Sequence, residues 1–245
     1  MKKGNADTFL SVETCRSLAR CRGGLYTLLS SAYIHVPAKK TLEFGWEPAV
    51  ELLRFPQEGS DEALQQIDKG LKLITSYGSR NNLFDEKTLT NLSKDWTHLF
   101  RGVERDGILP PYESLYRTGK LQEKPAREIH RLFSQMGIRV PDEWHQPQDY
   151  LGVELDFMRL LCSREFEACE RQEKKSIVEV VKAEKSFIEH HLGAWASKFC
   201  EKMGEQARED YYRGTAKLTI GLIEYDLVYT RNVTANSKHQ ISRPK

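Results

Sequence analysis

Apolar residues recur at helical spacing along almost the whole chain, and this pattern constrains the fold more than any other feature. The longest clean stripe consists of Ile177, Val181, Ile188, Leu192, Trp195 and Phe199. Residues three or four positions apart share one face of a helix, so this stripe predicts the buried face of a central helix. Short β-branched runs bounded by turn residues, which would indicate strands, are scarce. The sequence therefore predicts an all-α fold.

Polar residues and prolines mark several expected helix ends. Ser60 and Asp85 are candidate N-caps, because each precedes a helical stripe and carries a side-chain oxygen that can accept a backbone N–H. Pro147 is well placed as the first residue of a later helix. Residues 217–230 fit either a strand or a helix by their spacing. We expect a helix there, because no partner strand is evident elsewhere.

Length and composition indicate one globular domain. The chain of 245 residues is 39% hydrophobic and 29% charged, which is typical of soluble proteins large enough to bury a core. No stretch approaches the roughly 20 apolar residues of a membrane span. Lys2 and Lys3 are not followed by the apolar region of a secretory signal, so we expect a cytoplasmic protein without membrane insertion. The expected helical domain covers residues 1–230.

Charge and cysteine content exclude several kinds of site. No two of the five cysteines form a C-x-x-C pair, which argues against a zinc site and a disulfide framework. Residues 141–170 hold eight acids against two arginines, and no basic stripe indicates a nucleic-acid binder. Residues 231–245 are basic and lack a periodic apolar pattern, so we expect a disordered tail. We expect no bound metal or cofactor.

The stretch "ILPPYESLYRTGK" at residues 108–120 interrupts the helical pattern. Pro110 and Pro111 explain a helix end, because proline has no N–H to donate. They do not explain the polar and aromatic residues that follow. Ser114 could be imagined as a nucleophile beside Asp142 and His145, but it lacks the G-x-S-x-G elbow that exposes such a hydroxyl. A turn or capping role is preferred for this serine.

Three blocks, "DWTHLFRG", "LPPYESLY" and "QPQDYLGVELDFMRLL", together resemble the signature blocks of the TorD/DmsD/NarJ family of cytoplasmic molybdoenzyme chaperones. The blocks "CRGGLYTLLSSAYIHVP" and "FIEHHLGAWASKF" resemble the family's first helix and a late core helix. The resemblance implies an all-helical binding protein that is not an enzyme. Its partners would be the twin-arginine leader and the apo catalytic subunit of a dimethyl-sulfoxide-reductase-type molybdoenzyme, held until cofactor insertion. Residues 108–120 would be a hinge between the N- and C-terminal helical parts.

The resemblance also implies where the leader binds. A receptor for two arginines and an apolar segment needs carboxylates and an apolar groove. The expected leader-binding or client-binding residues are Trp96, Leu99, Phe100, Pro110, Pro111, Tyr112, Glu113, Ser114, Tyr116, Asp149, Tyr150 and Glu154. The first three share one helical stripe, so they also fit a place in the core.

The acidic block departs from the family pattern. Gln146 and Tyr150 stand where the family's Glu-Pro-x-Asp-His block has glutamate and histidine, so a contact that depends on imidazole charge is not implied here. Asp149 also fits a role at a helix N-terminus, where an acid is favourable without any ligand. Glu154 shares a face with apolar residues and needs a partner if buried. That partner would be a tyrosine hydroxyl or backbone amide near the hinge, or a leader arginine.

Other functions stay open on the sequence alone. A generic helical adaptor would bind partner helices without a role in cofactor insertion. A small hydrolase or nucleotide-dependent enzyme would use Ser114, Asp142 or His145. GTP or molybdopterin guanine dinucleotide is a further candidate ligand, although no G-x-x-x-x-G-K-[ST] loop occurs. The hinge would allow either a monomer or a domain-swapped dimer.

Overall fold

The computed structural model describes residues 11–42, 47–57, 59–83, 85–102, 107–138 and 147–241, and the side chains of Thr41 and residues 236–241 lie outside this description. Every regular element in the described part is helical, which confirms the all-α prediction. The elements are α1 (Val12–Ile34), α2 (Lys39–Leu42), α3 (Glu47–Leu52), α4 (Asp61–Arg80), α5 (Glu86–Phe100), α6 (Glu113–Thr118), α7 (Lys124–Gln135), α8 (Leu151–Glu170), α9 (Lys174–Phe187), the π-helix η1 (Ile188–Leu192), α10 (Gly193–Gln206) and α11 (Asp210–Ile241).

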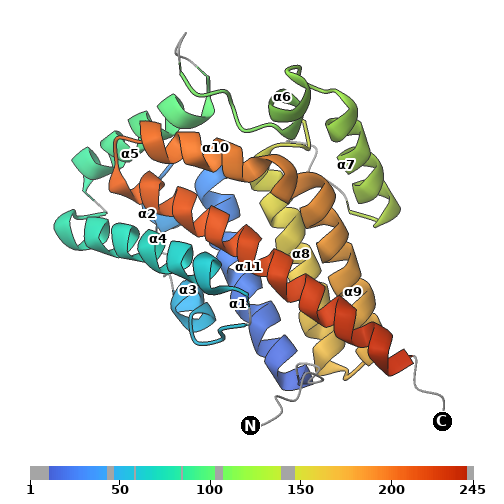
Figure 1. Ribbon diagram of the computed structural model, residues 1–245. Coiled ribbons are helices and arrows are strands. Elements are labelled where there is room, and N and C mark those ends of the chain that lie inside the picture. Colours follow the sequence, from blue (N-terminus) through green and yellow to red (C-terminus); the bar gives the residue numbers. More distant parts are fainter. Residues whose placement is uncertain are drawn as a thin grey trace.

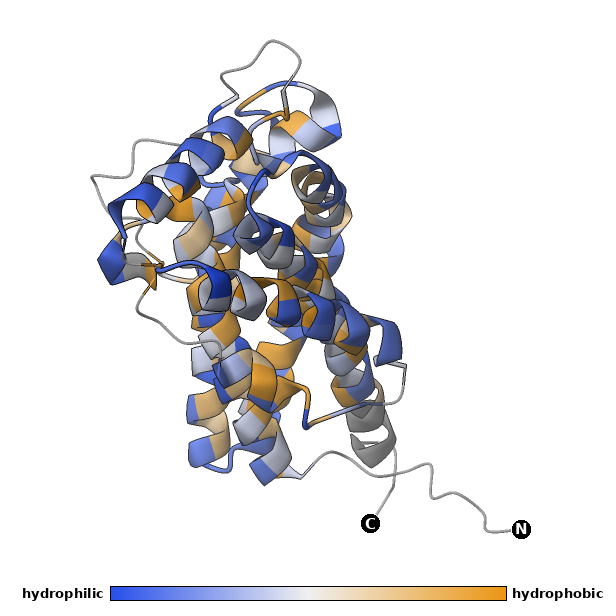
Figure 2. Cartoon of the chain, turned by 90° about the vertical axis from the view of Figure 1, so that its left-hand side faces the viewer, coloured by the Kyte–Doolittle hydropathy of each residue, from blue (hydrophilic) through white to orange (hydrophobic). Residues whose placement is uncertain are grey.

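Two long helix pairs form the centre of the bundle. Helix α1 packs along α8, and α4 packs along α11, while α9 contacts both α8 and α11 and α10 packs on α11 (Figure 1). Hydrophobic residues gather where the helices face one another, and hydrophilic residues lie mainly on the outward sides (Figure 2). Helices from before and after residues 108–120 thus share one continuous core. The hinge role of that stretch stays a prediction.

The predicted central stripe is buried as expected, but it does not lie on one uniform α-helix. Its residues span α9, η1 and α10, and all are at most 2% exposed. The π-helix inserts a wider turn between the two α-helices, a feature that often marks functional sites. A Cβ on Gly193, the first residue of α10, would lie 2.7 Å from the carbonyl oxygen of Ile188. The absence of a side chain at this position therefore permits the tight transition.

The helix ends confirm some sequence predictions and correct others. Asp85 accepts hydrogen bonds from the backbone N–H groups of Lys87 and Thr88, as expected of an N-cap. Ser60 occupies the N-cap position of α4, but its hydroxyl donates to the carbonyl of Gln57 instead of capping the helix. Pro147 is not helical, because α8 begins only at Leu151. The chain first forms a turn and contacts the Pro-Pro stretch.

The prediction of a helix over residues 217–230 was correct, because they lie in α11. The prediction of a disordered tail was wrong for residues 231–241, because α11 continues to Ile241. Val233 is 2% exposed and continues the buried face of Leu222 and Tyr229 by helical spacing. The prediction considered residues 231–245 separately from the preceding helix, and Val233 among basic residues shows no periodic pattern there. Residues 242–245 lie outside the described residues.

Helices α4 and α11 approach so closely that two facing positions have no room for a side chain. A Cβ on Gly70 would lie 2.7 Å from the carbonyl oxygen of Gly214, and a Cβ on Gly214 would lie 2.7 Å from that of Gly70. The pairing of α4 with α11 therefore depends on glycine at both positions.

A buried ionic cluster joins the first helix to three later ones. Arg22 of α1 donates to Glu165 of α8 at 2.7 Å, to Glu184 of α9 at 2.5 Å and to Asp226 of α11 at 2.7 Å. All four side chains are fully buried. Burial raises the pKa of the Glu165 and Glu184 carboxyls, because a charged carboxylate loses its hydration there. The hydroxyl of Tyr229 donates a further hydrogen bond to Glu165.

Candidate functional site

The Pro-Pro stretch is bound to the beginning of α8. The N–H of Leu151 donates to the carbonyl of Pro111 at 2.9 Å, and the N–H of Glu113 donates to the carbonyl of Asp149 at 2.9 Å. Between these bonds, Tyr112 and Tyr150 form an isolated antiparallel bridge with their rings 5.2 Å apart. Two blocks that the sequence places far apart therefore form one structural unit.

Asp149 caps the short helix α6 and not its own helix. Its Oδ2 accepts a hydrogen bond from the backbone N–H of Ser114 at 2.8 Å, at the N-terminus of α6. The sequence-based alternative, an acid at the start of the following helix, is corrected accordingly. Because Asp149 is fully buried, this bond ties α6 to the start of α8 without a contribution from solvent.

Three acidic side chains of the predicted site are fully buried: Glu113, Asp149 and Glu154. Glu154 Oε2 accepts a hydrogen bond from the indole N–H of Trp195 in α10 at 3.2 Å. Burial raises the pKa of Glu154 well above its usual value, and the negative charge of Glu113 raises it further. Among the described residues, the hydrogen-bond partner of Glu154 is this indole, and not a tyrosine hydroxyl or a backbone amide.

Three buried polar atoms in this region have no hydrogen-bond partner among the described residues. They are Ser114 Oγ, Asp149 Oδ1 and Glu154 Oε1. Leaving a buried acceptor unsatisfied costs about 1–3 kcal/mol, so proteins seldom leave several such atoms in one region. The region can therefore accept further hydrogen-bond donors.

Glu113 and Arg117 fasten α6 to the π-helix. Glu113 accepts a hydrogen bond from Arg117 Nη1. Its Oε2 lies 3.0 Å from His191 Nδ1 and accepts a second hydrogen bond in the tautomer that carries a proton on Nδ1. Arg117 Nη1 also donates to the backbone carbonyl of His190 at 2.9 Å. The π-turn thus presents one histidine side chain and one carbonyl to α6.

The aromatic residues of the predicted site divide between two environments. Tyr116 is half-buried and packs on Trp195 and Phe199, with ring centroids 5.4 and 5.8 Å away. Its hydroxyl donates to the carbonyl of Leu109 at 3.0 Å. Tyr150 is buried, and its hydroxyl donates to the carbonyl of Tyr33 at 2.6 Å. Both tyrosines therefore hold the Pro-Pro stretch and α8 against the bundle.

Three predicted groove residues, Trp96, Leu99 and Phe100, lie in the core and not at the surface. They are at most 2% exposed, and the indole N–H of Trp96 donates to the carbonyl of Ala32 at 3.2 Å. The structure therefore supports a place in the core for these three residues, which was the alternative to a place in the groove. Pro111 is buried as well, whereas Pro110 is partly exposed.

Sequence reasoning missed the residues that complete this region, namely Arg117, His190, His191 and Trp195. Neighbouring residues on a helix point to different faces, so the sequence gives no reason to place His190 and His191 at one site. No short motif connects them to Glu113 or Glu154, which lie far away in the chain. Asp142, His145 and Gln146 lie outside the described residues.

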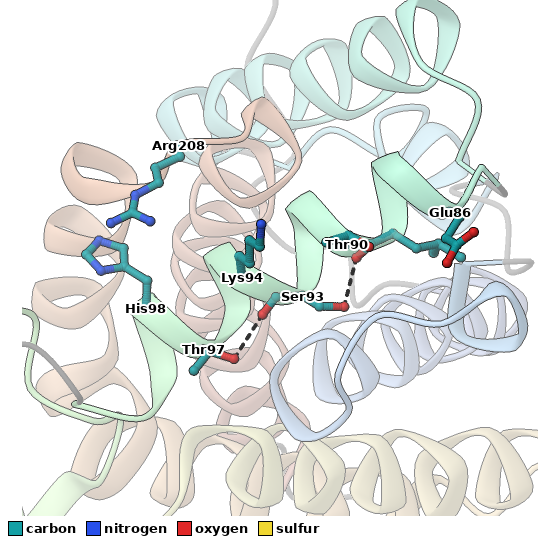
Figure 3. Close-up of a pocket in the computed structure, with 8 residues that line it drawn as sticks. Glu86, Thr90, Ser93, Lys94, Thr97, His98 and Arg208 are labelled. Atoms are coloured by element: carbon teal, nitrogen blue, oxygen red, sulfur yellow. Dashed lines mark hydrogen bonds between the residues drawn. The ribbon is translucent and has the colours of Figure 1, made fainter.

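A pocket of about 580 Å³ lies on α5, and Ser93, Thr97, His98 and Arg208 are among the residues that line it. The hydroxyl of Ser93 donates to the carbonyl of Leu89, and that of Thr97 donates to the carbonyl of Ser93. Figure 3 shows these two bonds along the helix and His98 facing Arg208. Both hydroxyls therefore donate to backbone carbonyls of their own helix.

The described residues hold no group of three or more histidine, cysteine or acidic side chains suited to a metal ion. Nor does any described helix have the length and apolar character needed to cross a membrane. Fold and site thus define an all-helical protein with a buried acidic region under a short, tethered helix. The serine that the sequence offered as a nucleophile, Ser114, is fully buried in this region.

Comparison with known proteins identifies the family. The model of the nitrate reductase delta subunit family matches residues 56–201, more than half of the chain, so the protein belongs to this family. It is 29% identical over 212 residues to the chaperone protein TorD of Vibrio parahaemolyticus, which covers 85% of this chain and 94% of the relative. It is 30% identical over 207 residues to TorD of Vibrio cholerae strain M66-2, covering 84% and 90%.

A third relative, TorD of Aliivibrio salmonicida, is 25% identical over 210 residues and covers 85% of this chain and 94% of the relative. These matches confirm the resemblance to the TorD/DmsD/NarJ family. The prediction that the chain is not an enzyme is confirmed at the level of the family, because the relatives are named as chaperones.

Proposed function

We propose that this protein is a cytoplasmic chaperone for a molybdoenzyme of the dimethyl-sulfoxide-reductase type. It binds the twin-arginine leader, the apo catalytic subunit or both, and assists cofactor insertion before export or assembly. The observation that carries the proposal is the similarity to TorD chaperones over 85% of the chain. Predicted residues from two separate blocks, Pro111 to Ser114 and Asp149 to Tyr150, also meet in one region, which supports a shared role.

The buried carboxylates suggest how a leader would bind. Asp149 and Glu154 each have one oxygen without a partner among the described residues, and a guanidinium carries five N–H donors that suit such acceptors. Because both carboxylates are fully buried, leader arginines reach them only after α6 moves away. We therefore include displacement of α6 in the proposal.

The ends of α6 are consistent with such a movement. Pro110 and Pro111 precede the helix, and Gly119 follows it with φ of 75° and open space around its Cβ position. The contacts that hold α6 down include the Asp149 cap, the bonds of Glu113 and Arg117 to the π-helix, and the packing of Tyr116 on Trp195 and Phe199. A leader guanidinium would replace the polar contacts with other polar contacts, so the main cost of displacement is the lost packing of Tyr116.

The proposal is tested with a fluorescent peptide. The peptide carries the leader of a molybdoenzyme catalytic subunit from the same cell, and anisotropy measures its affinity. We expect saturable binding that weakens about tenfold or more when both arginines become alanine, since charge-assisted bonds are worth ~1.5–3 kcal/mol. Glu154→Gln should weaken binding similarly, because the amide removes the negative charge but still accepts from Trp195. The matched control is the exposed Glu167→Gln on the same helix.

Two results would contradict this proposal. One is equal affinity for the arginine and alanine peptides, which would instead indicate the generic adaptor. The other is a Glu154→Gln variant that binds the leader like the wild type while circular dichroism shows an unchanged fold, which would place the arginines elsewhere.

A further inference from the structure

A groove on the other side of α6 has a chemistry opposite to that of the buried acidic region. It lies between α7 on one side and α9 with the π-helix on the other, and its volume is about 560 Å³. Figure 1 shows α7 at the edge of the bundle, beside α9. Three residues that line this groove, Arg117, His190 and His191, also take part in the contacts that hold α6. We name it the basic groove.

The floor of the basic groove is apolar and rigid. Phe157 and Phe187 pack with ring centroids 4.5 Å apart, and Phe133 stacks on Phe157 at 4.9 Å. Leu132 on α7 and Met136, the C-cap residue of that helix, are half-buried and both line the groove. The apolar side chains of a partner would therefore contact an apolar floor that is already formed in this structure.

The rim of the groove is cationic. Lys124, Arg131 and Arg117 line it, against Glu128 as the one acid among the lining residues. Arg131 is exposed and has no hydrogen bond or ion pair within the described parts of the chain. Lys124 lies 3.5 Å from Glu128, with its side chain 76% exposed. An ion pair this exposed contributes little and is readily exchanged for another partner.

We propose that the basic groove binds an acidic amphipathic segment of a partner protein, with apolar side chains on the floor and carboxylates against Lys124 and Arg131. Charge complementarity selects this occupant, because a segment rich in arginine would meet a like charge at the rim. A helix with apolar residues three or four positions apart matches a groove bounded by helices. The groove is thus a second docking site, which rests on residues other than the carboxylates of the proposed leader site and shares with it Arg117 and His191.

The first test uses a fluorescein-labelled synthetic helix of leucine and glutamate, compared with its counterpart in which lysine replaces every glutamate. We expect anisotropy to show saturable binding of the acidic helix alone, and weaker binding as salt increases. Lys124→Glu with Arg131→Glu should lower the affinity about tenfold or more. The matched control is Lys87→Glu with Lys94→Glu, which reverses two exposed charges on α5.

A second variant tests the floor separately from the rim. Leu132→Ala should weaken binding of the acidic helix without changing any charge, whereas Leu121→Ala, at a side chain 51% exposed, should not. Both groove variants should leave leader binding unchanged, so that failure at one site is distinguishable from failure at the other. Near-ultraviolet circular dichroism verifies that each variant keeps its tertiary packing.

Three outcomes would overturn the basic groove as a docking site. They are equal binding of the acidic and basic helices, equal loss in the α5 control, and displacement of the acidic helix by millimolar inorganic pyrophosphate whose own binding depends on Arg131 but not on Leu132. The last result would define a small-anion site instead of a protein-docking site.

Discussion

At the scale of single residues, Glu154 shows how burial changes the properties of a carboxyl group. Within the described part of the chain, the indole of Trp195 donates to one oxygen of Glu154, and the second oxygen has no partner. Desolvation therefore favours the protonated form, and the nearby charges of Glu113 and Asp149 act in the same direction. When a cation approaches, it offsets part of the free-energy cost of the ionised form of Glu154 in this buried place.

This predicts a pH dependence of stability. Because the folded state raises the pKa of Glu154 above the value of 4.5 expected for an unfolded chain, the folded protein binds this proton more tightly. Its contribution to stability is present below about pH 4.5 and is lost as the pH rises through the folded pKa. Glu154→Gln removes that loss. We expect its free energy of unfolding, relative to wild type, to increase between about pH 5 and pH 8.

Urea denaturation at each pH measures this difference, and the exposed Glu167→Gln controls for the loss of one negative charge. At about pH 5 the Glu154→Gln variant should lie within ~1 kcal/mol of wild type, because the amide oxygen still accepts from Trp195. A difference that decreases with rising pH would show that Glu154 is ionised in the folded protein.

At the scale of elements, the pairing of α4 with α11 depends on backbone contact. The two helices pass close enough for Gly70 and Gly214 to face each other's carbonyl oxygens, so the packing is set by the absence of side chains. Such an interface tolerates no added atoms, because neither backbone can move without disturbing the core around it.

Gly214→Ala should therefore destabilise the protein by about 1–3 kcal/mol through overpacking. Its new Cβ would lie 2.6 Å from Ile74 Cγ1 and 2.7 Å from the carbonyl oxygen of Gly70. Gly204→Ala is the matched control, because its Cβ would meet its nearest neighbour, Ala216, at an ordinary 3.9 Å. That variant should be neutral or up to ~1 kcal/mol more stable, since alanine favours a helix. Equal stability of both variants in urea would refute the close approach.

At the scale of the whole molecule, Arg22 connects both ends of the described chain. Its guanidinium binds carboxylates from α8, α9 and α11, and it lies over the ring of Tyr229 at 4.3 Å. The three acids depend on this one cation, because all are shielded from solvent. Removing the cation should leave uncompensated buried carboxyls at the junction of four helices.

Arg22→Met should consequently lower the free energy of unfolding by about 3–5 kcal/mol. Arg20→Met, on the same helix, removes an arginine that is 64% exposed and pairs with Glu51, and should cost only about 0–1 kcal/mol. Unfolding in guanidinium chloride, followed by circular dichroism, measures the free energy of unfolding of the two variants. Similar losses for both would mean that the buried cluster contributes no more than a surface ion pair.

The sequence by itself predicted the features that depend on neighbours along the chain. Helical spacing indicated the all-α fold and the buried stripe, and Asp85 was identified as an N-cap from its position. The spacing of residues 217–230 fitted a strand as well as a helix, and the helix was preferred because no partner strand was evident. The family followed from blocks of residues that stand in the right order. All of these features are local, or are repeated locally, so periodicity and motif are sufficient.

Only the tertiary structure decided which charged groups are buried and what they contact. Glu154 meets Trp195, and Glu113 meets His191, through contacts between segments distant in the sequence. The late start of α8 arises because Leu151 binds the carbonyl of Pro111. The acidic stretch suggested an open surface for arginines, but packing places Asp149 and Glu154 beneath α6. Burial and pairing depend on the arrangement of whole helices in space, and no local pattern specifies that arrangement.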